Sequence, residues 1–195
     1  MNSKSTNAIV ANNRATKIAV IGMLSALAFI TVVLIRIPVV LFLKYECKDI
    51  IIMLGGFLFG PYAVVAISLI VSFLEMITIS TTGYIGFIMN VLSTCCFALP
   101  AAILFKKKRS LVYAIVGLVI GVLLSTGAML AWNYLLTPIY MGYPRQAVAK
   151  MLLPTFLPFN LFKNGLNAAG CIIIHLPILF GLKKAHLLEQ MQPSK

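Results

Sequence analysis

Six apolar runs limit the folds that this chain can adopt. Of its 195 residues, 61% are hydrophobic and only 10% are charged. A helix needs about 20 apolar residues to cross a hydrocarbon core, and within lipid it satisfies its own backbone hydrogen bonds. The sequence therefore predicts an all-α integral membrane protein with six transmembrane helices and no separate soluble domain. The expected spans are residues 17–35, 49–59, 61–77, 84–105, 111–136 and 155–181.

Polar segments flank the predicted membrane domain, which covers residues 17–184. Residues 1–16 are expected to form a polar N-terminal tail and residues 185–195 a C-terminal tail. No small-residue cleavage signature follows the first run, so we expect an uncleaved helix and not a signal peptide. Six spans place both termini on one side, and that side carries ten Lys and Arg residues against five on the other. The positive-inside rule then predicts cytoplasmic termini in the cell membrane.

The connectors between the runs carry the chain's polar and turn-forming residues. Residues 39–48 are predicted to form an ordered loop outside the membrane, and residues 137–154 to form the longest loop. Gly60-Pro61 separates the second span from the third, because proline lacks an amide hydrogen and disfavours helix at the preceding residue. The basic residues flank apolar runs and do not alternate with aromatic side chains, so the net charge of +12 predicts no nucleic-acid partner.

Catalytic residue sets are sparse in this sequence. The four acids are Glu46, Asp49, Glu75 and Glu189, and His175, the histidine inside a predicted span, has no carboxylate at helical spacing. The cysteines lack metal-ligand spacing, and no phosphate-binding Gly-x-x-x-x-Gly-Lys segment occurs. We therefore expect no enzyme activity, no metal site and no cofactor. If the chain serves uptake, another subunit must supply the energy.

Lys163 is the lysine that the prediction places well inside a span. An uncompensated ammonium in hydrocarbon costs from about 3 to more than 10 kcal/mol, so such a residue usually faces a cavity, a partner or a ligand. Asn160 lies three residues earlier, on the same helix face. The alternative is a structural role, with the asparagines bonding between helices and the lysine snorkelling outward. The candidate ligand-binding residues are Asn133, Asn160, Lys163, Glu75 and Asn90. Glu75 is expected either to line the pocket or to pair with Lys163.

Three segments of the chain, residues 49–61, 133–140 and 158–163, resemble the substrate-binding S components of energy-coupling factor (ECF) vitamin transporters. The likeness is strongest to the riboflavin-specific branch, and it implies a vitamin pocket that uses Asn133, Asn160 and Lys163. The chain departs from that branch at residues 45–49 and 74–75, so pantothenate or a pyridoxine-type vitamin stays open as the ligand.

The resemblance also implies partners. These are a transmembrane coupling protein and two ATP-binding-cassette ATPases, which contact a small-residue face on the first helix. Ala19, Gly22 and Ala26 share such a face here. Packing against another span of the same chain is the alternative for these residues. A membrane assembly or regulatory protein without cargo is the alternative of another functional class.

Overall fold

Helices make up most of this protein. The computed structural model describes residues 3–40 and 43–184. A short antiparallel hairpin of β1 (Arg36–Val40) and β2 (Leu43–Glu46) joins the first helix to the second. The helices are α1 (Ser3–Leu34), α2 (Lys48–Phe59), α3 (Pro61–Thr78), α4 (Gly83–Lys107), α5 (Leu111–Met141), α6 (Arg145–Met151), the π-helical turn η1 (Leu152–Phe156) and α7 (Leu157–Lys184).

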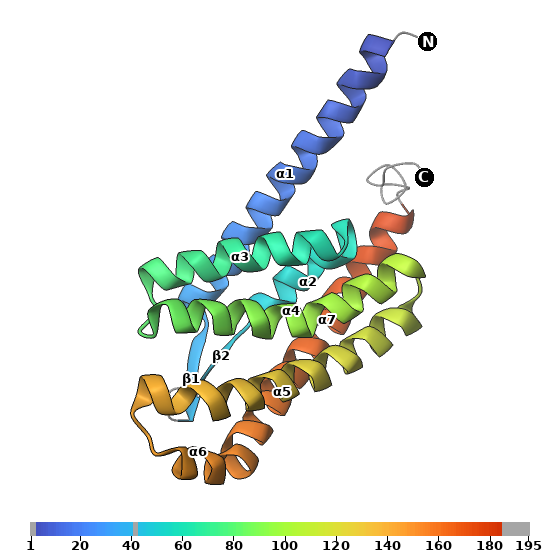
Figure 1. The fold of residues 1–195 in the computed structure, drawn as a ribbon. Coiled ribbons are helices and arrows are strands. Elements are labelled where there is room, and N and C mark those ends of the chain that lie inside the picture. Colours follow the sequence, from blue (N-terminus) through green and yellow to red (C-terminus); the bar gives the residue numbers. More distant parts are fainter. Residues whose placement is uncertain (1–2, 41–42, 185–195) are drawn as a thin grey trace.

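The two ends of the helix bundle carry different groups. Figure 1 shows the hairpin, the α3–α4 turn and the α5–α6 turn at one end, which we call the hairpin end. The start of α1, the end of α7 and the α4–α5 turn lie at the other end. Residues 106–109, a run of four basic side chains, occupy the α4–α5 turn. The strongest cluster of positive charge is therefore remote from the hairpin.

Four helices among the described residues are long and apolar enough to cross a membrane, namely Arg14–Leu34, Pro61–Thr78, Gly83–Lys107 and Leu111–Ile139. The protein is thus an all-helical membrane protein, as the sequence predicts. The second predicted run forms α2, which has 12 residues and rises only about 18 Å. The sixth run lies in α7. For these two runs, membrane crossing stays a prediction.

Several boundaries differ from the sequence prediction. Helix α1 begins at Ser3 and so continues into the predicted polar tail. The expected loop at residues 137–154 is mostly helical, since α5 runs on to Met141 and α6 follows. Gly142, with φ of +67°, ends α5 in the left-handed conformation that glycine adopts at little cost. The predicted C-terminal tail, residues 185–195, lies outside the described residues.

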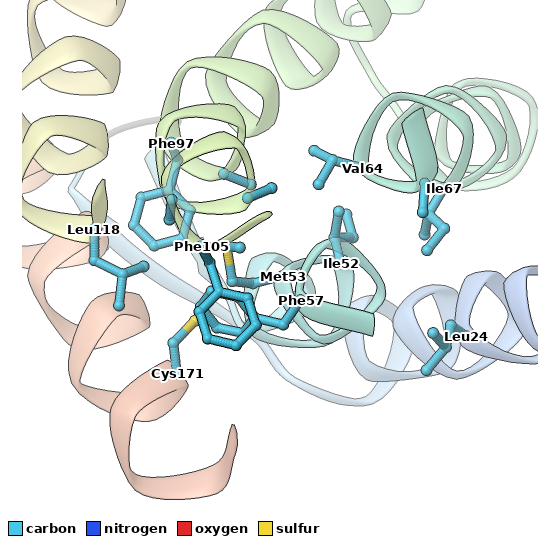
Figure 2. Packing of buried hydrophobic residues seen from close by; sticks show 14 of the residues in the cluster. Leu24, Ile52, Met53, Phe57, Val64, Ile67, Phe97, Phe105, Leu118 and Cys171 are labelled. Carbon is cyan, nitrogen blue, oxygen red and sulfur yellow. The ribbon is translucent and has the colours of Figure 1, made fainter. Parts of the chain in front are cut away.

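The apolar core lies between the inner faces of the helices. Phe57 of α2 meets Phe105 of α4 edge-on, with ring centroids 4.9 Å apart. Cys171 of α7 is buried in the same cluster, and all four cysteines are free. Figure 2 shows side chains from α1, α2, α3, α4, α5 and α7 converging on this core. Its labelled members are Leu24, Ile52, Met53, Phe57, Val64, Ile67, Phe97, Phe105, Leu118 and Cys171.

Two glycines let α5 approach α4 closely. A Cβ atom added at Gly117 would overlap the Ala101 backbone, and one added at Gly121 would overlap the Phe97 carbonyl oxygen. Backbone atoms cannot move aside as a flexible side chain can. The α4–α5 contact, the most extensive helix pair in the structure, therefore depends on the absence of side chains at these positions.

We expect Gly121→Ala to destabilise the protein by about 1 to 3 kcal/mol, because the added methyl group must force α5 away from α4. The apparent melting temperature of the detergent-solubilised protein measures this. Gly127→Ala is the matched control on the same helix, since its Cβ would meet nothing within 4 Å. Equal melting temperatures for the two variants would contradict the close-approach role of Gly121.

Candidate ligand-binding site

An open cavity lies at the hairpin end of the bundle. Its empty volume is about 890 Å³, counting the part that merges with solvent. The hairpin, the α3–α4 turn and helices α4, α5 and α7 form its walls. The lining residues are Arg36, Leu43, Lys44, Glu46, Ser80, Thr81, Thr82, Ile85, Gly86, Met89, Asn90, Ser93, Met129, Asn133, Phe159, Asn160 and Lys163.

Four of the five predicted site residues line this cavity. Asn90 comes from α4, Asn133 from α5, and Asn160 and Lys163 from α7. The fifth, Glu75 of α3, is buried beside the cavity and is not part of its lining. The structure thus brings together side chains that are far apart in the sequence. Whether they bind a ligand stays a prediction.

Two of the asparagines are oriented by their own helices. The Asn133 Nδ2 donates to the Met129 carbonyl at 2.8 Å, and its Oδ1 accepts from the Thr137 hydroxyl at 3.0 Å. The Asn160 Nδ2 donates to the Phe156 carbonyl at 2.8 Å. A carbonyl oxygen can only accept, so these bonds fix which end of each amide is nitrogen. Both amides are therefore set before a ligand arrives.

A buried ion network supports the hairpin wall of the cavity. Lys48 is the first residue of α2. Its ammonium group lies 3.0 Å from Glu46 Oε2 and 2.5 Å from Glu75 Oε1. The other oxygen of Glu46 lies 3.1 Å from Arg36 Nε. Arg36 and Glu46 face each other across the two strands, and Arg36 Nη1 also donates to the Ile79 carbonyl at 3.1 Å. The network thereby joins the hairpin to α2 and to the end of α3.

Lys163 has no carboxylate partner of its own among the described residues. Both acids near the cavity are already paired, with Lys48 and Arg36. Burial by itself would raise the pKa of Glu46, but the ammonium groups of Lys48 and Lys163 help to hold that pKa below its ordinary value. Two lysines of the cavity lining, Lys163 of α7 and Lys44 of β2, therefore have no ion pair among the described residues.

The pairing of Glu75 differs from the expected one. Glu75 meets Lys48 and not Lys163, and its second oxygen, Oε2, accepts from Asn90 Nδ2 at 2.7 Å. Sequence reasoning placed Lys48 and Glu46 in a connector outside the membrane and did not include them among the candidate binding residues. The sequence does contain a feature that could have indicated an ion pair. Lys48 lies between two acids, Glu46 and Asp49, at the start of an apolar run.

A second polar cluster links three helices to the hairpin. The Asp49 carboxylate of α2 accepts from the Thr94 hydroxyl at 2.6 Å and from Asn167 Nδ2 at 3.1 Å. The Asn167 Oδ1 in turn accepts from the Tyr45 hydroxyl at 3.1 Å. These bonds join α2, α4, α7 and the hairpin. Asn167 thus forms hydrogen bonds between helices, which is the structural role that the sequence left open for asparagines inside the spans.

The small-residue face of α1 is exposed. Ala19, Gly22 and Ala26 all point away from the bundle, and a Cβ atom added at Gly22 would meet nothing within 4 Å. Leu24 and Ala28 form the opposite, buried face of the same helix. Ala19, Gly22 and Ala26 therefore do not pack against another span of this chain. Their contact with a partner stays a prediction.

We expect stability to fall in acid partly through Glu46. A carboxyl whose pKa is lower in the folded protein contributes stability that is complete above its ordinary value of 4.5 and is lost as the pH falls through the folded value. Glu46→Gln should cost about 3 kcal/mol at pH 7, because Arg36 and Lys48 lose a counter-charge. Its melting temperature should also decline less between pH 6 and pH 3. Parallel declines in both proteins would exclude Glu46 as the titrating group.

Comparisons with known proteins agree with this architecture. A family model described as the substrate-specific component of ECF transporters matches residues 16–179. Riboflavin transporter FmnP of Bacillus subtilis (strain 168) is 30% identical over 190 residues, which cover 91% of this chain and 96% of that protein. Riboflavin transporter RibU of Staphylococcus aureus (strain TCH60) is 28% identical over 184 residues, which cover 90% and 93%.

The fold has a solved counterpart. The structure of the S component of a bacterial ECF transporter superposes on this one with a TM-score of 0.73 at 27% sequence identity, covering 87% of this chain and 99% of the other. The family model and these relatives each cover most of the chain and leave no large part of it unmatched. The chain belongs to the ECF transporter substrate-specific components.

Proposed function

We propose that this protein is the substrate-binding subunit of an ECF-type importer and that its ligand is riboflavin. The observation that carries the proposal is the polar wall of the cavity, where Asn160 Oδ1 offers an acceptor and Lys163 Nζ offers a charged donor. The flavin ring presents a matching edge, with an N–H donor between two carbonyl acceptors. The relatives named as riboflavin transporters support the same ligand.

The remaining wall suits a flat apolar ring. Leu43, Ile85, Met89, Met129 and Phe159 line the cavity beside the polar groups. Methionine side chains adapt to irregular shapes and pack well against aromatic rings. A flavin held there would bury its ring against these side chains while its polar edge meets α7.

The orientation in the membrane follows from charge. We propose six spans in the cell membrane with both termini in the cytoplasm, since the sequence assigns ten Lys and Arg residues to the side of the termini against five to the side of the hairpin. The cavity is at the hairpin end and would then open to the outside. This orientation suits capture of a vitamin from the medium.

Delivery needs an energy source that this chain lacks. We propose that it comes from a transmembrane coupling protein and two ATP-binding-cassette ATPases, as the family implies. The exposed face of Ala19, Gly22 and Ala26 is the proposed contact, because small side chains let helix backbones approach closely in lipid.

Riboflavin titrated into the purified protein should lose fluorescence as it binds. Lys163→Ala and Asn160→Ala should each weaken binding by about 1 to 3 kcal/mol, because each leaves a polar atom of the bound ligand unpaired. Lys106→Ala, at the opposite end of the bundle, is the control and should bind as the unmodified protein does. Unquenched riboflavin, together with thermal stabilisation by pantothenate or pyridoxine, would contradict the flavin assignment.

Ala26→Trp should abolish riboflavin uptake by cells while leaving binding in detergent unchanged, because a bulky side chain blocks the proposed coupling contact. Leu27→Trp is the matched control. Leu27 is also exposed, about 100° around the helix from Ala26. Loss of uptake in both variants, or in neither, would argue against a specific coupling face.

A further inference from the structure

Asn90 is oriented differently from the other asparagines of the cavity. The Nδ2 atoms of Asn133 and Asn160 donate to carbonyls four residues earlier on the same helix. Asn90 Nδ2 instead donates to a different helix, at 2.7 Å from Glu75 Oε2 of α3. The orientation of this amide therefore depends on a buried side chain that is not part of the cavity lining.

Glu75 is itself held in place from the other side. Its Oε1 atom is in an ion pair with the fully buried Lys48 ammonium, at 2.5 Å. An ionised carboxylate can accept hydrogen bonds but cannot donate them, so it admits only the nitrogen end of the Asn90 amide. Lys48, Glu75 and Asn90 thus form a chain of contacts that runs from the start of α2 to the cavity.

The consequence lies at the other end of the amide. No protein donor meets Asn90 Oδ1 among the described residues, and Asn90 lines the cavity. We propose that Glu75 is a positioning residue, which fixes Asn90 so that Oδ1 accepts a hydrogen bond from a donor on the ligand. The inference rests on the proposed riboflavin-binding function. In riboflavin the donor is a hydroxyl of the ribityl chain, since the ring N–H is matched to Asn160 Oδ1.

This assignment separates two roles among the buried polar groups. Glu75 does not touch the ligand, and a change there acts through Asn90. Asn160 is independent of Glu75, since the Phe156 carbonyl orients it. A change at Glu75 is therefore coupled to a change at Asn90 and additive with a change at Asn160.

The test measures riboflavin affinity by fluorescence quenching in two double-mutant cycles. Asn90→Ala should weaken binding about tenfold, as expected for the loss of one hydrogen bond. Glu75→Gln should weaken it several-fold, because the Lys48 ammonium takes the carboxamide oxygen and the carboxamide nitrogen then faces Asn90, which meets it with Oδ1 and no longer presents that oxygen to the ligand. In the Asn90→Ala background, Glu75→Gln should change affinity less than twofold. In the Asn160→Ala background it should have its full effect.

Two analogues identify the ligand's donor. N3-methylriboflavin lacks the ring N–H, and lumiflavin lacks the ribityl hydroxyls. The penalty of Asn90→Ala should disappear with lumiflavin and persist with N3-methylriboflavin. An equal penalty with all three ligands would overturn the acceptor role of Asn90. Equal coupling of Glu75→Gln to Asn90→Ala and Asn160→Ala would show that Glu75 has only a general structural role and does not position Asn90.

Riboflavin binding by the unmodified protein shows which proposal has failed, the riboflavin-binding function or the positioning role of Glu75. If it binds riboflavin but the cycles are additive at Asn90, the positioning role is wrong while the function stands. If it binds neither riboflavin nor the analogues, the proposed function fails, and the positioning role fails with it. Affinities measured well below the melting temperature of each variant exclude unfolding as the cause of weak binding.

Discussion

The cavity depends on one buried ammonium group. Lys48 is fully enclosed and lies between Glu46 of the hairpin and Glu75 of α3. Burying an unpaired charge costs several kcal/mol, so the lysine holds both acids close to the start of α2. The hairpin is otherwise a two-stranded ribbon, which has little stability of its own. Its position over the cavity is therefore set by the ion pairs together with the Tyr45–Asn167 hydrogen bond and the burial of Leu43 against Val148, Phe156 and Phe159.

The same network decides which cations of the cavity stay unpaired. Arg36 and Lys48 are neutralised by Glu46 and Glu75, and this leaves the lining residues Lys44 and Lys163 without a counter-ion among the described residues. The proposed binding role of Lys163 thus falls on a lysine that the network does not use. This matters in a membrane protein, because a cation shared between an internal acid and a ligand would have to break one contact to make the other.

Much of this arrangement could be predicted from the sequence. The helices follow from apolar run lengths, since a chain in lipid must pair its backbone groups locally. Lys163 and Asn160 were identified because polar groups in such runs are costly, and four of the five predicted site residues do line one cavity. The expected loop at residues 137–154 was wrong, because the helical stretches on both sides of Gly142 contain enough polar residues to resemble a connector.

The sequence by itself determined the class of protein, the approximate helices and the residues worth suspecting, because hydropathy and the cost of buried polar groups are local properties. Only the tertiary structure decided which partners those residues have. Glu75 lies 27 residues from Lys48, and pairing with Lys163 was equally compatible with the sequence. The choice depends on which helix ends meet beneath the hairpin, and the packing of α2 against α3 sets this.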